Sequence, residues 1–145
     1  MFSNKIVVIT GGSDGIGKAL AEALLKQGAK VATCGRNQNK LDSLASDNAN
    51  LPLFTMIADV SKEEDCKNFI QAAIAKFGGI DILINNAGIS MRALFKDTEL
   101  DTLRNVMNIN FCGTVYCTNF AMDAAIERKG SIVGVYSIAG YRGLP

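Results

Sequence analysis

The sequence has 145 residues and a formal net charge of +1, with 48% hydrophobic and 20% charged residues. This length suits one domain with its own core, and this composition is globular rather than disordered. We expect no nucleic-acid partner, no membrane span and no signal peptide, because no basic stripe and no long apolar run occurs. Histidine is absent, which excludes histidine-based triads and most zinc sites, so no metal site is predicted.

The four cysteines, Cys34, Cys66, Cys112 and Cys117, form no C-x-x-C pair and lie in apolar surroundings. This pattern favours reduced thiols in a core over disulfide bonds. Because reduced thiols are typical of intracellular proteins, we expect a cytoplasmic location.

Short apolar segments alternate along the chain with segments of helical periodicity. The expected strands cover residues 5–10, 30–34, 53–58, 80–84 and 131–136. The expected helices cover residues 15–27, 37–47, 61–78 and 99–128. Ser61 and Glu64 have the spacing of a capping box at the start of the third helix. Strict alternation predicts an α/β fold, a doubly wound parallel sheet with helices on both faces.

A glycine-rich turn, residues 10–17, joins the first strand to the first helix. Its glycines, Gly11, Gly15 and Gly17, allow a sharp turn and let a phosphate approach the amino end of the helix. The spacing is G-x-x-x-G-x-G rather than G-x-G-x-x-G, and the G-K-[ST] of a P-loop is missing. The turn predicts a nucleotide site, and a tight turn without a ligand is the alternative.

The end of the second strand bears on which dinucleotide would bind. NAD sites usually carry a carboxylate there for the ribose 2′-hydroxyl, but this strand ends with Cys34 and Gly35, followed by Arg36 and Asn37. A guanidinium suits a 2′-phosphate, so NADP is favoured over NAD. Arg36 on a solvated loop is the alternative, and Asp14 in the glycine turn opposes a phosphate nearby.

Three motifs resemble the cofactor site of short-chain dehydrogenases/reductases (SDR) of the classical type. They are Thr10-Gly11-x-x-x-Gly15-Ile16-Gly17, Asp59-Val60 and Asn85-Asn86-Ala87-Gly88. With the features above, the resemblance implies NAD(P) contacts at Thr10, Gly11, Ser13, Asp14, Gly15, Ile16, Gly17, Arg36, Asn37, Asp59, Val60, Asn86, Ala87 and Gly88. From the residues alone, Asp59 could equally cap a turn, and the asparagines could bond loop backbone.

Two further residues stand where this family has catalytic groups, Asn110 in the fourth helix and Ser137 after the fifth strand. The resemblance implies hydride transfer between nicotinamide and a carbonyl or alcohol, with Ser137 bonding the substrate oxygen and Asn110 holding a water. Asn110 facing solvent and Ser137 capping a turn are the alternatives. Met91 and Phe95 in the loop at residues 89–96 hint at an apolar substrate, although core packing explains them as well. Family members are also expected to form homodimers or homotetramers.

The sequence departs from the family at the catalytic Tyr-x-x-x-Lys, which is absent. Four residues beyond Tyr116, Tyr136 and Tyr141 stand Phe120, Gly140 and Pro145. We therefore expect residues 1–145 to be an NAD(P)-binding Rossmann domain that ends before this motif and is inactive alone. It should hold five of seven strands, in the order 3-2-1-4-5. The alternative is a non-catalytic nucleotide-binding or interaction module, truncated in nature.

Overall fold

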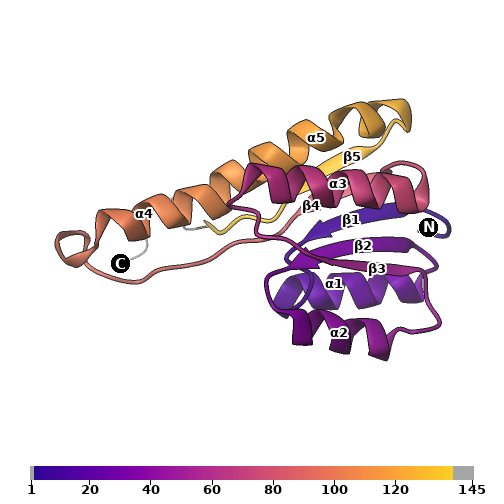
Figure 1. Ribbon diagram of the computed structural model, residues 1–145, viewed down its shortest axis with the longest axis horizontal. Helices are drawn as coiled ribbons and strands as arrows, with labels where there is room; N and C mark the ends of the chain where they lie inside the picture. The colour runs from indigo at the N-terminus through magenta and orange to yellow at the C-terminus, as the bar shows by residue number, and fades with distance from the viewer. Residues whose placement is uncertain (1, 139–145) are drawn as a thin grey trace.

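Five parallel strands build the sheet, in the order β3-β2-β1-β4-β5 (Figure 1). The computed structural model describes residues 2–138. The strands are β1 (Ile6–Thr10), β2 (Lys30–Gly35), β3 (Leu53–Ile57), β4 (Ile82–Asn85) and β5 (Ser131–Gly134). The parallel sheet and its order confirm the predicted fold class.

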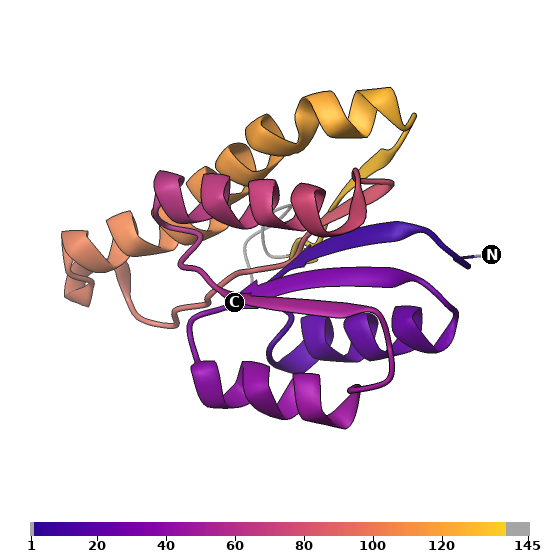
Figure 2. The ribbon, with the colours of Figure 1, turned by 45° about the vertical axis from the view of Figure 1, so that its right-hand side comes forward.

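Helices cover both faces of the sheet, as Figure 2 shows. On one face lie α1 (Gly15–Lys26) and α2 (Gln38–Asp47), and on the other lie α3 (Glu63–Phe77) and α5 (Gly113–Glu127). Because side chains alternate along a strand, Val7 and Ile9 of β1 pack in the core under α1, while Val8 packs in the core under α3 and α5. Every residue of β1 is therefore buried, as expected for a central parallel strand.

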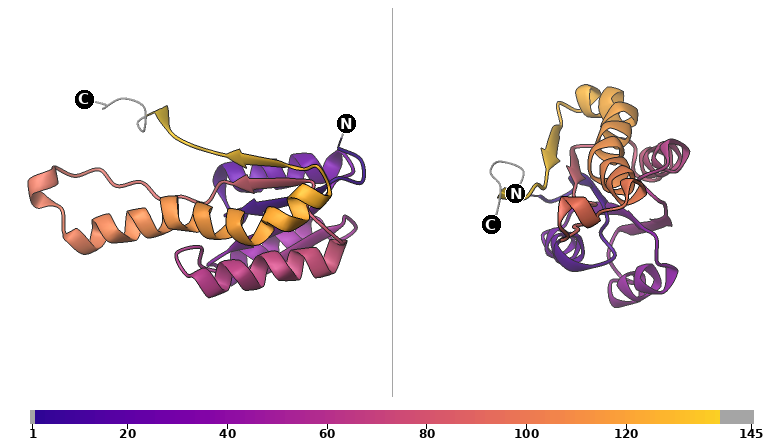
Figure 3. Two further views of the ribbon diagram at one scale, coloured as in Figure 1. Left: turned by 90° about the horizontal axis from the view of Figure 1, so that it is seen from above. Right: turned by 90° about the vertical axis from the view of Figure 1, so that its left-hand side faces the viewer.

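The predicted helix over residues 99–128 forms, with one π-helical turn inside it. Helix α4 (Leu100–Met107) passes through a π-helical turn, Asn108–Cys112, into α5. Figure 3 shows α4 reaching beyond the edge of the sheet, and none of its residues is buried. A short 3₁₀ turn, Phe95–Asp97, precedes it. Among residues 2–138, no helix combines the length and hydropathy that crossing a bilayer requires.

The predicted capping box at the start of α3 does not form. The helix begins at Glu63, and the residue before it, Lys62, makes no capping hydrogen bond through its side chain. The Ser61 hydroxyl instead donates to the Asp59 carboxylate at 2.8 Å, because Ser61 lies in the turn before the helix, beside a charged acceptor. Acidic side chains in the first turn, including Glu63 and Glu64, favour this helix start through the helix dipole.

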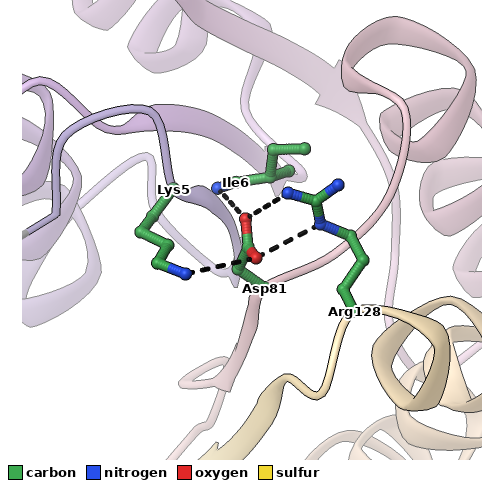
Figure 4. A network of polar contacts seen from close by, with 4 residues as sticks. All are labelled: Lys5, Ile6, Asp81 and Arg128. Carbon is green, nitrogen blue, oxygen red and sulfur yellow. Dashed lines mark hydrogen bonds and ion pairs between the residues drawn. The ribbon is translucent and has the colours of Figure 1, made fainter.

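A buried carboxylate joins strand starts to the end of α5, on the edge of the sheet opposite the strands' carboxyl ends (Figure 4). Asp81, just before β4, accepts hydrogen bonds from the Ile6 N–H at 2.8 Å and from the Arg128 guanidinium at 3.2 and 3.1 Å. The Lys5 ammonium lies 3.6 Å away. This network fixes β1, β4 and α5 relative to one another.

Two parts of the chain expose apolar side chains, strand β5 and the helical arm from α4 to α5. All four residues of β5 are exposed, as expected for a strand at the sheet edge. The helical arm from α4 to α5 also exposes large apolar side chains, namely Leu100, Met107, Phe111, Val115, Met122 and Ile126.

The four cysteines are free thiols, and three of them are buried. Burial raises the pKa of the Cys34 thiol to about 12, so this thiol stays neutral at physiological pH.

Candidate functional site

A pocket of about 670 Å³ opens at the carboxyl ends of β1, β2 and β4. Open α/β sheets bind ligands at this edge, where neighbouring crossovers run in opposite directions. Every predicted cofactor residue except Thr10 lines the pocket, together with Cys34, Gly35, Lys40, Ala58, Ile89 and Ile109.

The glycine-rich turn packs tightly against the loop after β4. A Cβ atom at Gly17 would lie 2.4 Å from the Gly11 carbonyl oxygen and 2.5 Å from the Asn86 side-chain nitrogen. Gly11 itself has φ +70°, and a Cβ there would lie 2.9 Å from the Ala87 backbone. The amino end of α1 at Gly15 has open space instead, with nothing within 4 Å of a Cβ position. A phosphate can therefore reach the free amides there.

Thr10 holds this turn together from inside. It is 2% exposed, and its hydroxyl oxygen accepts hydrogen bonds from the N–H groups of Asn86 and Ala87, both at 3.0 Å. The Asn86 side-chain amide returns a bond to the Thr10 carbonyl at 3.0 Å. Thr10 therefore positions two pocket-lining residues rather than lining the pocket itself.

The start of α2 supplies two cations to the pocket. Arg36 follows β2, and Asn37 caps α2 by accepting the Lys40 N–H at 3.1 Å. The Lys40 ammonium pairs with Asp14, which caps α1 by accepting the Gly15 N–H at 2.8 Å. The hydrogen bond from Lys40, followed by the one from Gly15, holds the pKa of the Asp14 carboxyl below its usual value.

Asp59 follows β3 and closes another side of the pocket. Its carboxylate accepts hydrogen bonds from the Ser61 N–H at 3.0 Å and from the Ser61 hydroxyl. Partial burial acts to raise the pKa of Asp59, but the Ser61 bonds and the charges of Arg36 and Lys62 outweigh it and lower that pKa. Asp59 therefore stays ionised, and it both caps its turn and faces the pocket.

Asn110 lies in the π-helical turn, and its side chain forms hydrogen bonds with the backbone of the segment after β4. Its oxygen accepts the Ile89 N–H and its nitrogen donates to the Ile89 carbonyl, both at 2.9 Å. Ile89 lines the pocket, so Asn110 positions a pocket wall. π-Helical turns frequently occur at functional sites. Ser137 is exposed three residues beyond β5, and Tyr141 lies outside the described residues.

Six lining residues were not among the predicted cofactor contacts: Cys34, Gly35, Lys40, Ala58, Ile89 and Ile109. Lys40 is one, and its position one turn beyond Arg36 is the signal that could have found it. Ile89 and Ile109 supply an apolar wall; Ile89 begins the loop at residues 89–96 that the sequence singles out, and Ile109 has no motif to distinguish it from core residues. Within residues 2–138, no group of three or more Cys, Asp or Glu side chains is arranged to hold a metal ion.

Known proteins resemble this chain in sequence over nearly its whole length. The sequence profile of the family described as short chain dehydrogenase matches residues 5–145. The chain belongs to this family. It is 38% identical to "11-beta-hydroxysteroid dehydrogenase-like 4A" of Arabidopsis thaliana, across 99% of this chain and 49% of the relative. It is 34% identical to an uncharacterized oxidoreductase of Staphylococcus aureus (strain MRSA252), across 97% of this chain and 62% of the relative.

Two solved structures superpose closely on this short-chain dehydrogenase chain. A 3-ketoacyl-(acyl-carrier-protein) reductase from Brucella melitensis, complexed with NADH, matches with a TM-score of 0.93 and 28% identity, across 100% of this chain and 62% of that one. A Serratia marcescens short-chain dehydrogenase/reductase mutant matches with a TM-score of 0.92 and 26% identity, across 99% and 59%. The chain thus spans about half to three fifths of its relatives' length.

Proposed function

We propose that this short-chain dehydrogenase binds NADP and belongs to an oxidoreductase that transfers hydride between nicotinamide and a carbonyl or alcohol. One observation carries the proposal: the pocket joins the open amino end of α1 to the guanidinium of Arg36. Amides at a helix start suit a pyrophosphate, and a guanidinium beyond β2 suits a 2′-phosphate. The NADH-bound relative supports the nicotinamide class, and Arg36 supports the phosphorylated form.

The residues present fit such a dinucleotide. Gly15 leaves the pyrophosphate position clear, and Gly17 lets the helix start lie against the β4 loop. We assign the adenine side to Asp59 and Val60, and the adenosine-side wall to the segment from Asn86 to Gly88, as the family resemblance implies.

A bound nicotinamide would supply or accept the hydride, and this chain would orient the substrate. We assign hydrogen bonding of the substrate oxygen to Ser137. The Asn110 amide bonds the Ile89 backbone through both its oxygen and its nitrogen, so we assign Asn110 to holding the pocket wall as well as to a proton relay. No tyrosine here is followed by lysine four residues later. We therefore propose that residues 1–145 alone turn over negligibly, since losing a general acid lowers rates by about 10²–10⁴.

An apolar carbonyl or alcohol is the proposed substrate class. Ile89 and Ile109 give the pocket an apolar wall, and the relatives named hydroxysteroid dehydrogenase-like support this class. The exposed apolar side chains of the helical arm from α4 to α5 support self-association as a homodimer or homotetramer.

Titration with NADP⁺ and NAD⁺ tests the cofactor proposal. We expect NADP⁺ to bind more tightly than NAD⁺. Arg36→Ser should weaken NADP⁺ binding by about tenfold or more, because a charge-assisted hydrogen bond is lost. Arg104→Ser is the matched control, because Arg104 pairs with Asp101 on α4 outside the pocket. Absence of binding by either dinucleotide would reject the proposal, and tighter NAD⁺ binding would reject NADP.

The alternative, a non-catalytic nucleotide-binding or interaction module, draws support from the exposed apolar surface of β5 and α5. Ser137 favours the enzyme, since a module that only binds a nucleotide does not need it, whereas the bonds of Asn110 to Ile89 would serve either function. Measurable NADPH oxidation with a ketone by residues 1–145 would contradict the non-catalytic module and would show that another group serves as the acid.

A further inference from the structure

An ion pair in the lining of the pocket links two helix starts. Asp14, the N-cap of α1, bonds the ammonium of Lys40 in the first turn of α2. The two residues are 26 positions apart in the chain, and both line the pocket. Their side chains are 70% and 50% exposed, so both remain accessible to a ligand.

The backbone at both ends of this pair is held independently of the pair. Asp14 uses one carboxylate oxygen to accept the Gly15 N–H, and only its other oxygen meets Lys40. The Lys40 N–H is held by the Asn37 side chain at 3.1 Å. The ammonium can therefore change partners while both helix starts stay in place, because a lysine stem is long and flexible.

The charges around the pocket balance without a ligand. Four charged side chains line it: Asp14, Asp59, Arg36 and Lys40. Within the described residues, no carboxylate lies at ion-pair distance from Arg36, whereas Lys40 is already paired. A 2′-phosphate brings about two negative charges. In this pocket the phosphate would meet one unpaired cation, one paired cation and two carboxylates that repel it.

We propose that Lys40 is a second cation for the 2′-phosphate of the dinucleotide and that Asp14 competes with this phosphate for Lys40. Asp14 thereby limits how strongly the protein prefers NADP over NAD. The inference rests on the proposed dinucleotide site and adds two determinants of its specificity. A purely structural link between α1 and α2 would instead affect both dinucleotides equally.

Isothermal titration of matched variants with NADP⁺ and NAD⁺ distinguishes a specificity role of the Asp14–Lys40 pair from a purely structural one. Asp14→Asn removes the charge and keeps a good N-cap. Lys40→Gln removes the ammonium. Lys18→Gln is the control, because Lys18 also lies near the start of α1 but pairs with Glu22 and Asp47 and does not line the pocket.

We expect Asp14→Asn to tighten NADP⁺ binding about threefold to fivefold and Lys40→Gln to weaken NADP⁺ binding about fivefold. These factors correspond to the free energies typical of exposed charge pairs. NAD⁺ affinity should stay within about twofold in both variants, and Lys18→Gln should change neither. Both effects should shrink at high salt, because exposed charges are screened. When Lys40→Gln is already present, adding Asp14→Asn should increase NADP⁺ affinity by a smaller factor than it does in the wild type.

Two sets of results would contradict the role proposed for Asp14 and Lys40. Equal shifts for NADP⁺ and NAD⁺, or no shift in either variant, would overturn the inference while leaving the dinucleotide site intact. A wild-type protein that binds neither dinucleotide would contradict the proposed function, and the inference would fall with it.

Discussion

Asparagine in place of Asp81 would remove the charge at the centre of the network in Figure 4. Asp81 is 6% exposed and accepts one hydrogen bond from Ile6 and two from Arg128. Asparagine keeps an oxygen for the Ile6 N–H, but its NH₂ group would face a guanidinium that has only donors. At least one polar group would then be left unpaired among the strand starts.

The cost follows from these contacts. A hydrogen bond to a charged group contributes about 1.5–3 kcal/mol, and a fully buried pair broken at one partner costs about 3–5 kcal/mol. Because the Arg128 side chain is 37% exposed, water offsets part of its loss. We therefore expect Asp81→Asn to lower the free energy of unfolding by about 2–3 kcal/mol. Lys5→Met should cost no more than about 0.5 kcal/mol, since Lys5 is half exposed.

The effect should depend on pH. Burial acts to raise the pKa of Asp81, but the bonds from Arg128 and Ile6, with the charges of Arg128 and Lys5, outweigh it and lower that pKa. A lowered folded-state pKa means that the carboxylate stabilises the fold above the unfolded value, about 3.9, and that this contribution is lost as pH falls through the folded-state pKa. The gap between wild type and Asp81→Asn should therefore narrow below about pH 4.

Urea unfolding followed by circular dichroism measures these differences. Wild type, Asp81→Asn and Lys5→Met would be compared at neutral pH and at successively lower pH, as far as each stays folded. Our reasoning is refuted if Asp81→Asn lies within about 0.5 kcal/mol of wild type at neutral pH. It is also refuted if the gap stays constant as pH falls through the carboxyl range.

Three further substitutions test the core and the site. Phe69→Ala should cost about 3–5 kcal/mol in the same urea assay, since Phe69 is fully buried; a loss below 1 kcal/mol would contradict this. Gly17→Ala should destabilise the turn by about 1–3 kcal/mol and weaken NADP⁺ binding in a titration, because its Cβ meets the Gly11 carbonyl; wild-type affinity would contradict the tight approach. Thr10→Val should cost about 1–3 kcal/mol by leaving two N–H groups unpaired, and unchanged unfolding would show that water replaces the hydroxyl.

Much of the fold was predictable because its signals are local. Consecutive β-branched residues in β1 and alternating helical segments indicate a parallel sheet without any knowledge of contacts. The glycine-rich turn could also be predicted locally, because each of its glycines is needed for the backbone conformation or the close packing at its own position. Two local details differ from the sequence prediction. Ser61 had a nearby carboxylate to bond, and the helix at Asn110 widened into a π turn while its side chain bonded Ile89.

The sequence by itself determined the order of strands and helices, the glycine-rich turn and the family. The tertiary structure decided which polar side chains meet: Thr10 with the β4 loop, Asp81 with Arg128, and Asp14 with Lys40. The physical reason is the distance along the chain over which each interaction acts. Backbone preference and hydrophobic periodicity act over a few residues, whereas a hydrogen bond between distant residues depends on which strands and helices end side by side.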